Sequence, residues 1–355
     1  MSNELLQVRT ALATTTNTVG VVNSAAGGAE IQKLIDTAIV ESVNRAVDFR
    51  PMVSRKPLNQ LAYIWNMRTG LGNKVAFYSE GATGTPDPSP KTQLTAIAKS
   101  IRADYEVTGL QMAASASYYS ALADEAKDAA TALVMAEEMA FLCGSDAAAY
   151  GLAGAYDGLI QLMGSFGAFG DTDVIYGTAR AAARPELDVA VVLAAPAALD
   201  DLDLEDLDAA ITTSNKAGAK GAKRIFLVSE ERADEISQLL QSQQIFQGTL
   251  ELEGGFSVST YKRVPIVASR FMDKNGVSWV SPTKTFTHTD NAMYLLDMDE
   301  IEFRVVNGVD TMSVPIRGAD ASSRSDVEGG YIKTYGTFVM KEFTKQVMIA
   351  NLNTP

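Results

Sequence analysis

The sequence has 355 residues, of which 46% are hydrophobic and 21% charged. This is the composition of a globular protein of two or three domains, and it excludes a disordered or fibrous chain. The 30 basic and 43 acidic residues give a formal net charge of -13, which argues against a protein whose main task is to grip nucleic acid, because phosphates require a basic face. A local basic patch is compatible with this balance.

Residues 1–29 are expected to form an arm, because they show no lasting apolar period and cannot bury enough surface to fold alone. The first residues lack the basic and apolar regions of a signal peptide. The longest uncharged stretch, 10–29, is too polar to span a bilayer. We therefore expect a soluble protein, made inside the cell, with no membrane partner. From Ile31 to Val43 apolar residues recur at three and four positions, which predicts an amphipathic helix that ends before Pro51.

Residues 62–108 predict a long β excursion. The segments 63–68 and 74–79 are rich in aromatic and branched side chains, as strands are. Glycines and prolines dominate 79–90 and exclude both a helix and a central strand there. Residues 101–107 alternate strictly between apolar or small and charged side chains, which indicates a strand with one covered face. Together these segments predict a projecting arm with little core of its own.

Residues 117–143 contain neither proline nor glycine and are dense in Ala, Leu, Met and Glu, which predicts one long helix ended by Gly144. At 1.5 Å per residue, about 27 residues make a rod of about 40 Å. A rod of this length outspans a small core, so we expect it to serve as a strut.

An α/β domain is predicted over residues 150–290, because strand-like and helix-like segments alternate there with short loops. The expected strands are 190–193, 224–228 and 264–268, and the expected helices are 151–163, 202–211 and 231–244. The tail returns to strands that we expect to pack on the long helix, at 294–296, 301–306, 311–316, 336–342 and 346–350.

The candidates for chemistry are few. The acidic run 200–208 lacks the glycine and glutamate spacing of an EF-hand, so a helix N-terminus is the better interpretation. The loop 215–224 has glycines and lysines but not the phosphate-loop pattern, and it precedes a strand rather than following one. The single cysteine, Cys143, excludes an internal disulfide and a cysteine-based zinc site, and we expect it to be a buried small hydrophobe. A histidine-based site would have to use His288, which lies in a polar alternating stretch. We expect no catalytic, cofactor or metal site.

Five charged residues are the candidates for contacts between subunits. They alternate with apolar residues on the predicted arm, whose strands have no obvious intramolecular partner face. An exposed β arm is otherwise an aggregation hazard, so a neighbouring copy is its expected partner. The candidates are Lys74, Glu80, Lys91, Arg102 and Glu106.

The order of these elements resembles that of a known family. Local motifs match as well: Phe-Leu-Cys-Gly-Ser-Asp at 141–146, Gly-Leu-Ala-Gly at 151–154, Tyr-Lys-Arg-Val-Pro-Ile-Val at 261–267, Tyr-Gly-Thr-Phe-Val-Met-Lys at 335–341 and Ile-Ala-Asn-Leu at 349–352. Arg263 stands where the family commonly has glycine. From about residue 30 the chain resembles the major capsid proteins of tailed bacteriophages, whose Johnson fold is shared with encapsulins.

The resemblance implies an α+β Johnson fold with an N-terminal arm, an extended β loop, a long spine helix, a peripheral domain and an α/β axial domain. The arm would be residues 1–29 and the extended loop 62–108. The axial domain would be residues 150–290. The peripheral domain, with the spine helix, would comprise 30–61, 109–149 and 291–355.

The resemblance also implies a structural protein of the virion, not an enzyme. It would be made in the host cytoplasm and assemble with itself into hexamers and pentamers of an icosahedral shell around double-stranded DNA, with weak DNA contact at most. A separate scaffolding protein, a portal and a possible decoration protein would be its partners. Two alternatives stay open: an encapsulin-like nanocompartment shell, and an α/β enzyme with a β insertion that would need His288 or an unrecognised carboxylate pair.

Overall fold

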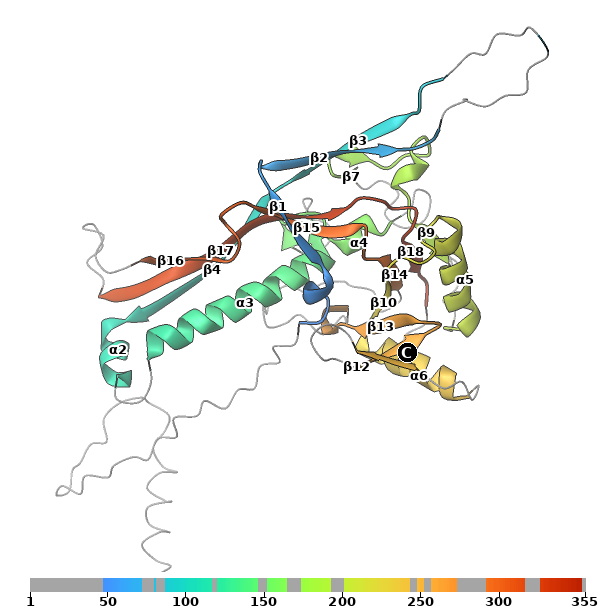
Figure 1. Cartoon of the computed structure of the whole chain (residues 1–355). Coiled ribbons are helices and arrows are strands. Elements are labelled where there is room, and N and C mark those ends of the chain that lie inside the picture. Colours follow the sequence, from blue (N-terminus) through green and yellow to red (C-terminus); the bar gives the residue numbers. More distant parts are fainter. Residues whose placement is uncertain are drawn as a thin grey trace, which may run out of the picture. The chain divides into compact units, whose positions relative to one another are not determined.

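A five-stranded sheet, a seven-stranded sheet and one long helix organise the chain (Figure 1). The computed structural model describes a set of segments that all belong to one compact unit, residues 42–355. The predicted arm and the predicted helix after residue 30 lie outside them. The described residues are 47–71, 80, 87–116, 120–145, 152–164, 174–192, 201–242, 248–251, 257–272, 292–316 and 326–352.

The five-stranded sheet lies on the long helix α3 (Ala121–Cys143). Four of its strands follow in the order β1 (Ser54–Leu58), β15 (Ile301–Val306), β17 (Val327–Met340) and β16 (Met312–Ile316), and β4 (Lys99–Thr108) pairs with β17. Ile101, Ala103 and Ile332 pack toward Ala129 and Leu133 of α3. The alternation of residues 101–107 is thus confirmed as a strand with one covered face.

The long helix forms as predicted, with a later start. Ser120 caps α3 by accepting a hydrogen bond from the backbone N–H of Ala123, and α2 (Gly109–Ser115) occupies the preceding turns. The helix ends at Gly144, whose φ of -65° is not left-handed. A Cβ there would lie 2.4 Å from the carbonyl oxygens of both Ala140 and Tyr156. Close backbone packing, and not a left-handed cap, therefore explains this glycine.

A two-stranded hairpin, β2 (Ala62–Arg68) and β3 (Lys91–Ile97), stands apart from both large sheets. Its inner face buries Met67, Leu94 and Ala96 in the main core. The predicted strand 74–79 lies outside the described residues. Because β4 pairs with β17, we favour assigning 99–108 to the five-stranded sheet and ending the projecting loop at β3.

The seven-stranded sheet confirms the predicted α/β unit. Its strands follow in the order β11 (Gly248–Glu251), β12 (Ser257–Tyr261), β13 (Val264–Ala268), β10 (Arg224–Val228), β14 (Met293–Asp297), β18 (Val347–Ile349) and β9 (Ala190–Val192). Helix α5 (Leu204–Lys216) contacts β9 and β18, and α6 (Glu230–Ser242) contacts β13. The predicted acidic helix start is confirmed, because Asp203 and Asp206 form a capping box at the start of α5.

Two expectations from the sequence are wrong. The strands β14 and β18 join the seven-stranded sheet and not the sheet that β15, β16 and β17 form on the long helix, although Tyr294, Leu296 and Met348 share the main core with the end of α3. Both strands are buried on both faces, as suits central strands. The predicted helix 151–163 reduces to a strand β6 (Leu152–Ala153) and a helix α4 (Leu159–Leu162). Gly158 serves close packing there, since a Cβ would lie 2.6 Å from the backbone nitrogen of Gly144. The other short elements are η1 (Arg50–Met52), β5 (Gly144–Ser145), β7 (Val174–Ile175), β8 (Thr178–Ala179), η3 (Pro185–Leu187) and η4 (Arg270–Met272).

The turn between β12 and β13 holds two basic residues in left-handed backbone conformations. Lys262 has φ 47° and Arg263 φ 71°, and the flanking Tyr261 and Val264 are paired, which is a type I′ hairpin turn. We expect Arg263→Gly to raise the free energy of unfolding by about 0.5–1 kcal/mol, because glycine adopts this conformation without a Cβ clash. Urea denaturation of unassembled subunits measures the change.

The matched control is Lys262→Gly. It relieves the same strain but removes the exposed ion pair of Lys262 with Asp208, so its gain should be smaller. A less stable Arg263→Gly variant would show that the arginine side chain matters more than the backbone.

Candidate assembly surfaces

The outer face of the β2–β3 hairpin is apolar at its base and basic at its far end. Ile64 is 52% exposed and Ile97 58% on this face, and Leu61, in the bend that precedes β2, is 71% exposed. Ile64 and Ile97 are diagonal neighbours on this face, because Ile64 pairs with Thr95. Arg68 lies directly opposite Lys91, and neither makes an ion pair with another described residue. We call Leu61, Ile64, Arg68, Lys91 and Ile97 the hairpin patch.

Within the described segments, the five side chains of the hairpin patch are all exposed and its two cations have no ion-pair partner. Like charges placed directly opposite each other on neighbouring strands are destabilising. Contiguous exposed apolar side chains cost free energy in water and are typical of interaction sites. A subunit that keeps both features on one face is expected to cover them with another molecule.

The structure does not gather the five predicted contact residues on one surface. Lys91 belongs to the hairpin patch, Glu80 is an exposed turn residue, and Lys74 lies outside the described residues. Arg102 and Glu106 lie on β4, on the face that points away from α3. Arg102 has partners in its own chain, because it pairs with Asp104 and its guanidinium lies 4.1 Å from the ring centre of Tyr331. The role of all five in assembly stays a prediction.

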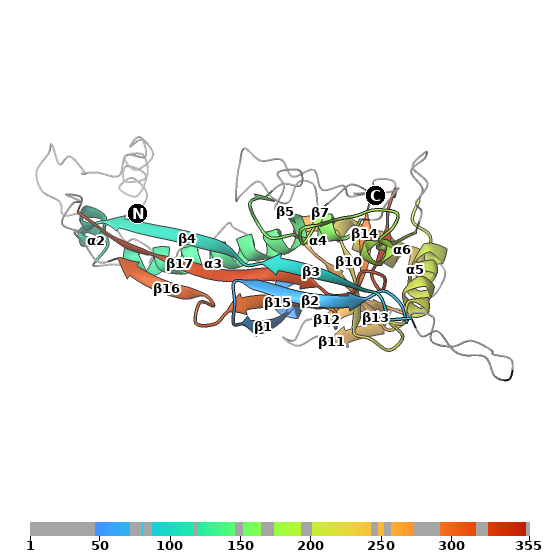
Figure 2. The same ribbon diagram turned by 90° about the horizontal axis from the view of Figure 1, so that it is seen from above.

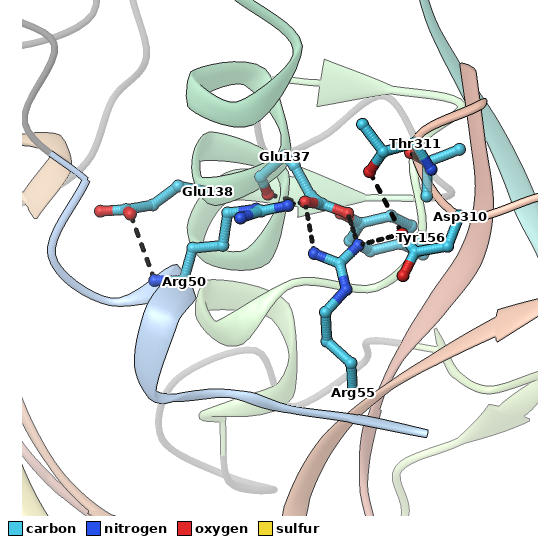
Figure 3. Close-up of polar contacts among 8 residues, drawn as sticks. Arg50, Arg55, Glu137, Glu138, Tyr156, Asp310 and Thr311 are labelled. Atoms are coloured by element: carbon cyan, nitrogen blue, oxygen red, sulfur yellow. Dashed lines mark hydrogen bonds and ion pairs between the residues drawn. The ribbon is translucent and has the colours of Figure 1, made fainter. Parts of the chain in front are cut away.

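An ionic cluster around the buried Glu137 holds the strand that leads into the hairpin (Figure 3). Glu137 of α3 has a fully buried side chain and pairs with both Arg50 and Arg55. Arg55 donates to the two Glu137 oxygens over 3.1 and 2.9 Å, and to Asp310 over 3.0 Å. We call these four residues the arginine clasp. It ties η1 and β1 to the last turns of the long helix.

Glu138, the next residue on α3, also binds the segment around Arg50, through backbone groups. It accepts hydrogen bonds from the backbone N–H groups of Asp48 and Arg50 and from the hydroxyl of Ser269, each over 3.2 Å. Burial raises the pKa of this carboxyl, and the backbone donors oppose the rise. Neither glutamate was a candidate from the sequence. Two adjacent carboxylates among the apolar side chains of 133–143 were the signal that could have revealed them.

A third buried carboxylate, Glu302 of β15, supports the base of the hairpin. It pairs with Lys56 over 2.7 Å, with Lys341 over 3.0 Å and with Arg304. The Arg304 guanidinium lies 4.4 Å from the ring centre of Tyr63 on β2 and donates to its hydroxyl. This chain of contacts links the five-stranded sheet to the hairpin.

The Glu302 cluster predicts a pH dependence. Burial opposes ionisation of Glu302, but Lys56, Lys341 and Arg304 outweigh it and hold the pKa below its usual value of 4.5. A carboxyl with a lowered folded-state pKa contributes stability above its unfolded pKa, and loses it as the pH falls. We therefore expect the difference in unfolding free energy between the wild type and Glu302→Gln to shrink as the pH falls below about 4.5. Urea denaturation at a series of pH values measures this difference, and a gap that widens toward acid pH would contradict the assignment.

The described residues offer little for catalysis. Cys143 is buried, and burial raises the pKa of its thiol to about 12, which disfavours the reactive thiolate. Within the described segments no group of His, Cys, Asp and Glu side chains is arranged to hold a metal ion. His288 lies outside them. None of the described helices has the length and apolar character required to span a bilayer.

Solved structures share this fold over nearly the whole chain. A capsid chain of cyanophage A-1(L) is 13% identical, with a TM-score of 0.64 over 91% of this chain and 98% of its own. The capsid chain of an empty GTA particle is 14% identical, with a TM-score of 0.61 over 92% and 98%. The holo-SrpI encapsulin from Synechococcus elongatus is 10% identical, with a TM-score of 0.56 over 98% and 95%. The chain therefore has the Johnson fold of phage capsids and encapsulins. No protein-family model and no curated protein matches it.

Proposed function

We propose that this chain is the major capsid protein of a tailed bacteriophage, a structural shell subunit and not an enzyme. The observation that carries the proposal is a Johnson fold matched over 91% of the chain and 98% of a capsid chain, with TM-score 0.64. The hairpin patch adds physical support, since no described segment of the chain covers its exposed isoleucines and opposed cations.

The proposal also includes the assembly partners of the protein and its location in the virion. Copies of the chain would form hexamers and pentamers of an icosahedral shell, in the virion, after synthesis in the host cytoplasm. A net charge of -13 suits a wall that encloses DNA without binding it tightly. A separate scaffolding protein, a portal and a possible decoration protein complete the set of proposed partners.

Within the proposed subunit, the five-stranded sheet with α3 would be the peripheral domain and the seven-stranded sheet the axial domain. The strand pairing supports two adjustments of the boundaries expected from the sequence. β4 goes with the peripheral domain because it pairs with β17. β14 and β18 go with the axial domain because they pair with β10 and β9.

An encapsulin-like nanocompartment is the second candidate, because an encapsulin matches 98% of this chain. Both candidates are shell proteins, and they differ in whether the shell encloses DNA or an enzyme. Portal, terminase and scaffold genes beside the coding gene favour the capsid. A neighbouring enzyme gene whose product carries a docking tail favours the nanocompartment.

The test of a shell function is the size of the purified protein. We expect sedimentation velocity and light scattering to show uniform particles far larger than a single 37.9 kDa subunit when the chain is produced with its scaffold. A stable monomer that turns over small substrates would contradict the proposal and favour the α/β enzyme alternative.

A further inference from the structure

We infer that a cluster of cations at one end of the seven-stranded sheet binds the phosphate backbone of double-stranded DNA, a contact that rests on the proposed function and deepens it. The cluster lies where the chain enters β10 and β13. Three lysines end α5 or follow it before β10, and one arginine belongs to the turn between β12 and β13. We call Lys216, Lys220, Lys223 and Arg263 the basic end.

The register of the sheet brings the loop and the turn together. The strands β10 and β13 are parallel neighbours, and Phe226 lies beside Ile266. Extending this register back by three residues places Lys223 beside Arg263, at the usual strand spacing of about 4.8 Å between backbones. The side chains of all four cations are exposed. They therefore share one surface, although they come from distant parts of the chain.

The basic end has few carboxylates to neutralise it. Among the described residues, none forms an ion pair with its four cations. The carboxylates of Asp208 and Glu300 pair with other lysines, and Asp297 is buried. The exposed Asp299 accepts a hydrogen bond from the backbone N–H of Lys223 over 3.2 Å. The surface is therefore locally positive on a chain whose net charge is -13.

Backbone strain at Arg263 indicates a task for its side chain. Lys262 and Arg263 are both left-handed, with φ 47° and 71°, a conformation that is unfavourable for residues with a Cβ. Turns of this type usually hold Asn and Gly instead. Lys262 forms an ion pair with Asp208, whereas no described residue pairs with Arg263. Strained residues of this kind cluster at functional sites.

The surroundings favour a nucleic acid over a protein partner. The core of a protein interface is apolar and rich in aromatic side chains, but in the described segments 201–242 and 257–272 no large hydrophobic side chain is exposed. Only alanines and glycines separate the three lysines. A Cβ on Gly218 or Gly221 would meet no other atom within 4 Å, so phosphates can approach the loop closely. Contacts to phosphates require cations and carry no sequence information.

A salt titration of DNA binding by unassembled subunits tests the contact. We expect log K for a short fluorescent DNA duplex to fall with log salt with a slope of about -3.6, because each of four neutralised phosphates contributes about -0.9. Lys220→Gln, Lys223→Gln and Arg263→Gln together should reduce the slope to about -0.9 and weaken binding by about tenfold or more at low salt. A duplex of unrelated sequence should behave in the same way. Fluorescence anisotropy measures the binding.

A matched variant separates the basic end from net charge. Arg102→Gln, Lys127→Gln and Lys333→Gln remove the same three charges from β4, α3 and β17. Figure 2 shows α2, which precedes α3, at the far end of the molecule from α5. This variant should keep the slope of the wild type. A thermal melt checks that both triple variants are folded.

Two smaller changes keep the test independent of folding. Arg263→Gly alone should reduce the slope by about 0.9 while it stabilises the subunit. A purely structural arginine would not combine these two effects. If the triple variant of the basic end does not fold, Lys220→Gln with Lys223→Gln replaces it and should reduce the slope by about 1.8.

The outcomes distinguish the DNA contact from the proposed function. A wild type that forms shells but binds DNA no better than the variant of the basic end would overturn the contact alone. An equal loss in the matched variant would show that net charge governs binding, which also overturns it. Unchanged DNA binding with impaired assembly would make the basic end a contact between subunits instead. A wild type that forms no particles would refute the shell function, while the titration would still decide whether the basic end binds DNA.

Discussion

Replacing Glu137 by alanine is expected to lower the free energy of unfolding by about 3–5 kcal/mol. The carboxylate is fully buried and is shared by Arg50 and Arg55, so its removal leaves two arginines without their common partner. The measurement is urea denaturation of unassembled subunits, followed by far-ultraviolet circular dichroism.

Two controls frame this prediction. Glu125→Ala removes an exposed carboxylate of the same helix and should change stability by about 0.5 kcal/mol or less. The triple replacement of Arg50, Arg55 and Glu137 by methionine should cost less than Glu137→Ala alone, because no buried charge is left unpaired. If the triple variant is the less stable of the two, the arginine clasp is a net source of stability rather than a set of mutually dependent charges.

Truncating Phe141 to alanine is expected to cost about 3–5 kcal/mol through the cavity it leaves. Phe141 is 1% exposed, and its ring centre lies 5.0 Å from that of Phe303, 5.1 Å from that of Phe338 and 5.9 Å from that of Tyr156. The ring therefore joins the long helix, the five-stranded sheet and the segment that follows the helix.

Leu110→Ala is the matched control, since it truncates a large apolar side chain that is 80% exposed. We expect a loss of about 0.5 kcal/mol or less in stability. Equal losses of stability in the two variants would mean that Leu110 is buried in the subunit in solution, contrary to the structure.

The fold could be predicted from the sequence where one local pattern dominates. The uninterrupted run 117–143 predicts α3, and the alternation from Ile101 to Val107 predicts β4, because a helix and a half-covered strand impose their own periods on the side chains. Pairing over long sequence separations leaves no such local signal. Contacts between distant segments decide that β4 pairs with β17 and that β18 lies between β14 and β9.

The residues of the candidate surfaces could likewise be predicted only where a local pattern marks them. Glu106 could be predicted as exposed because charged residues alternate with apolar or small ones along its strand. The opposition of Arg68 and Lys91 could not, because it depends on the register of β2 against β3 across a long loop. The helix predicted over 151–163 does not form because Gly154 has a left-handed φ of 81° and Gly158 packs closely against Gly144, a contact that spacing does not reveal.

Electron cryomicroscopy of the assembled protein tests the central claim most directly. The account predicts closed icosahedral shells in which each subunit has the Johnson fold described above. Open sheets, irregular aggregates or isolated subunits under every assembly condition would contradict the claim that this chain is a shell protein.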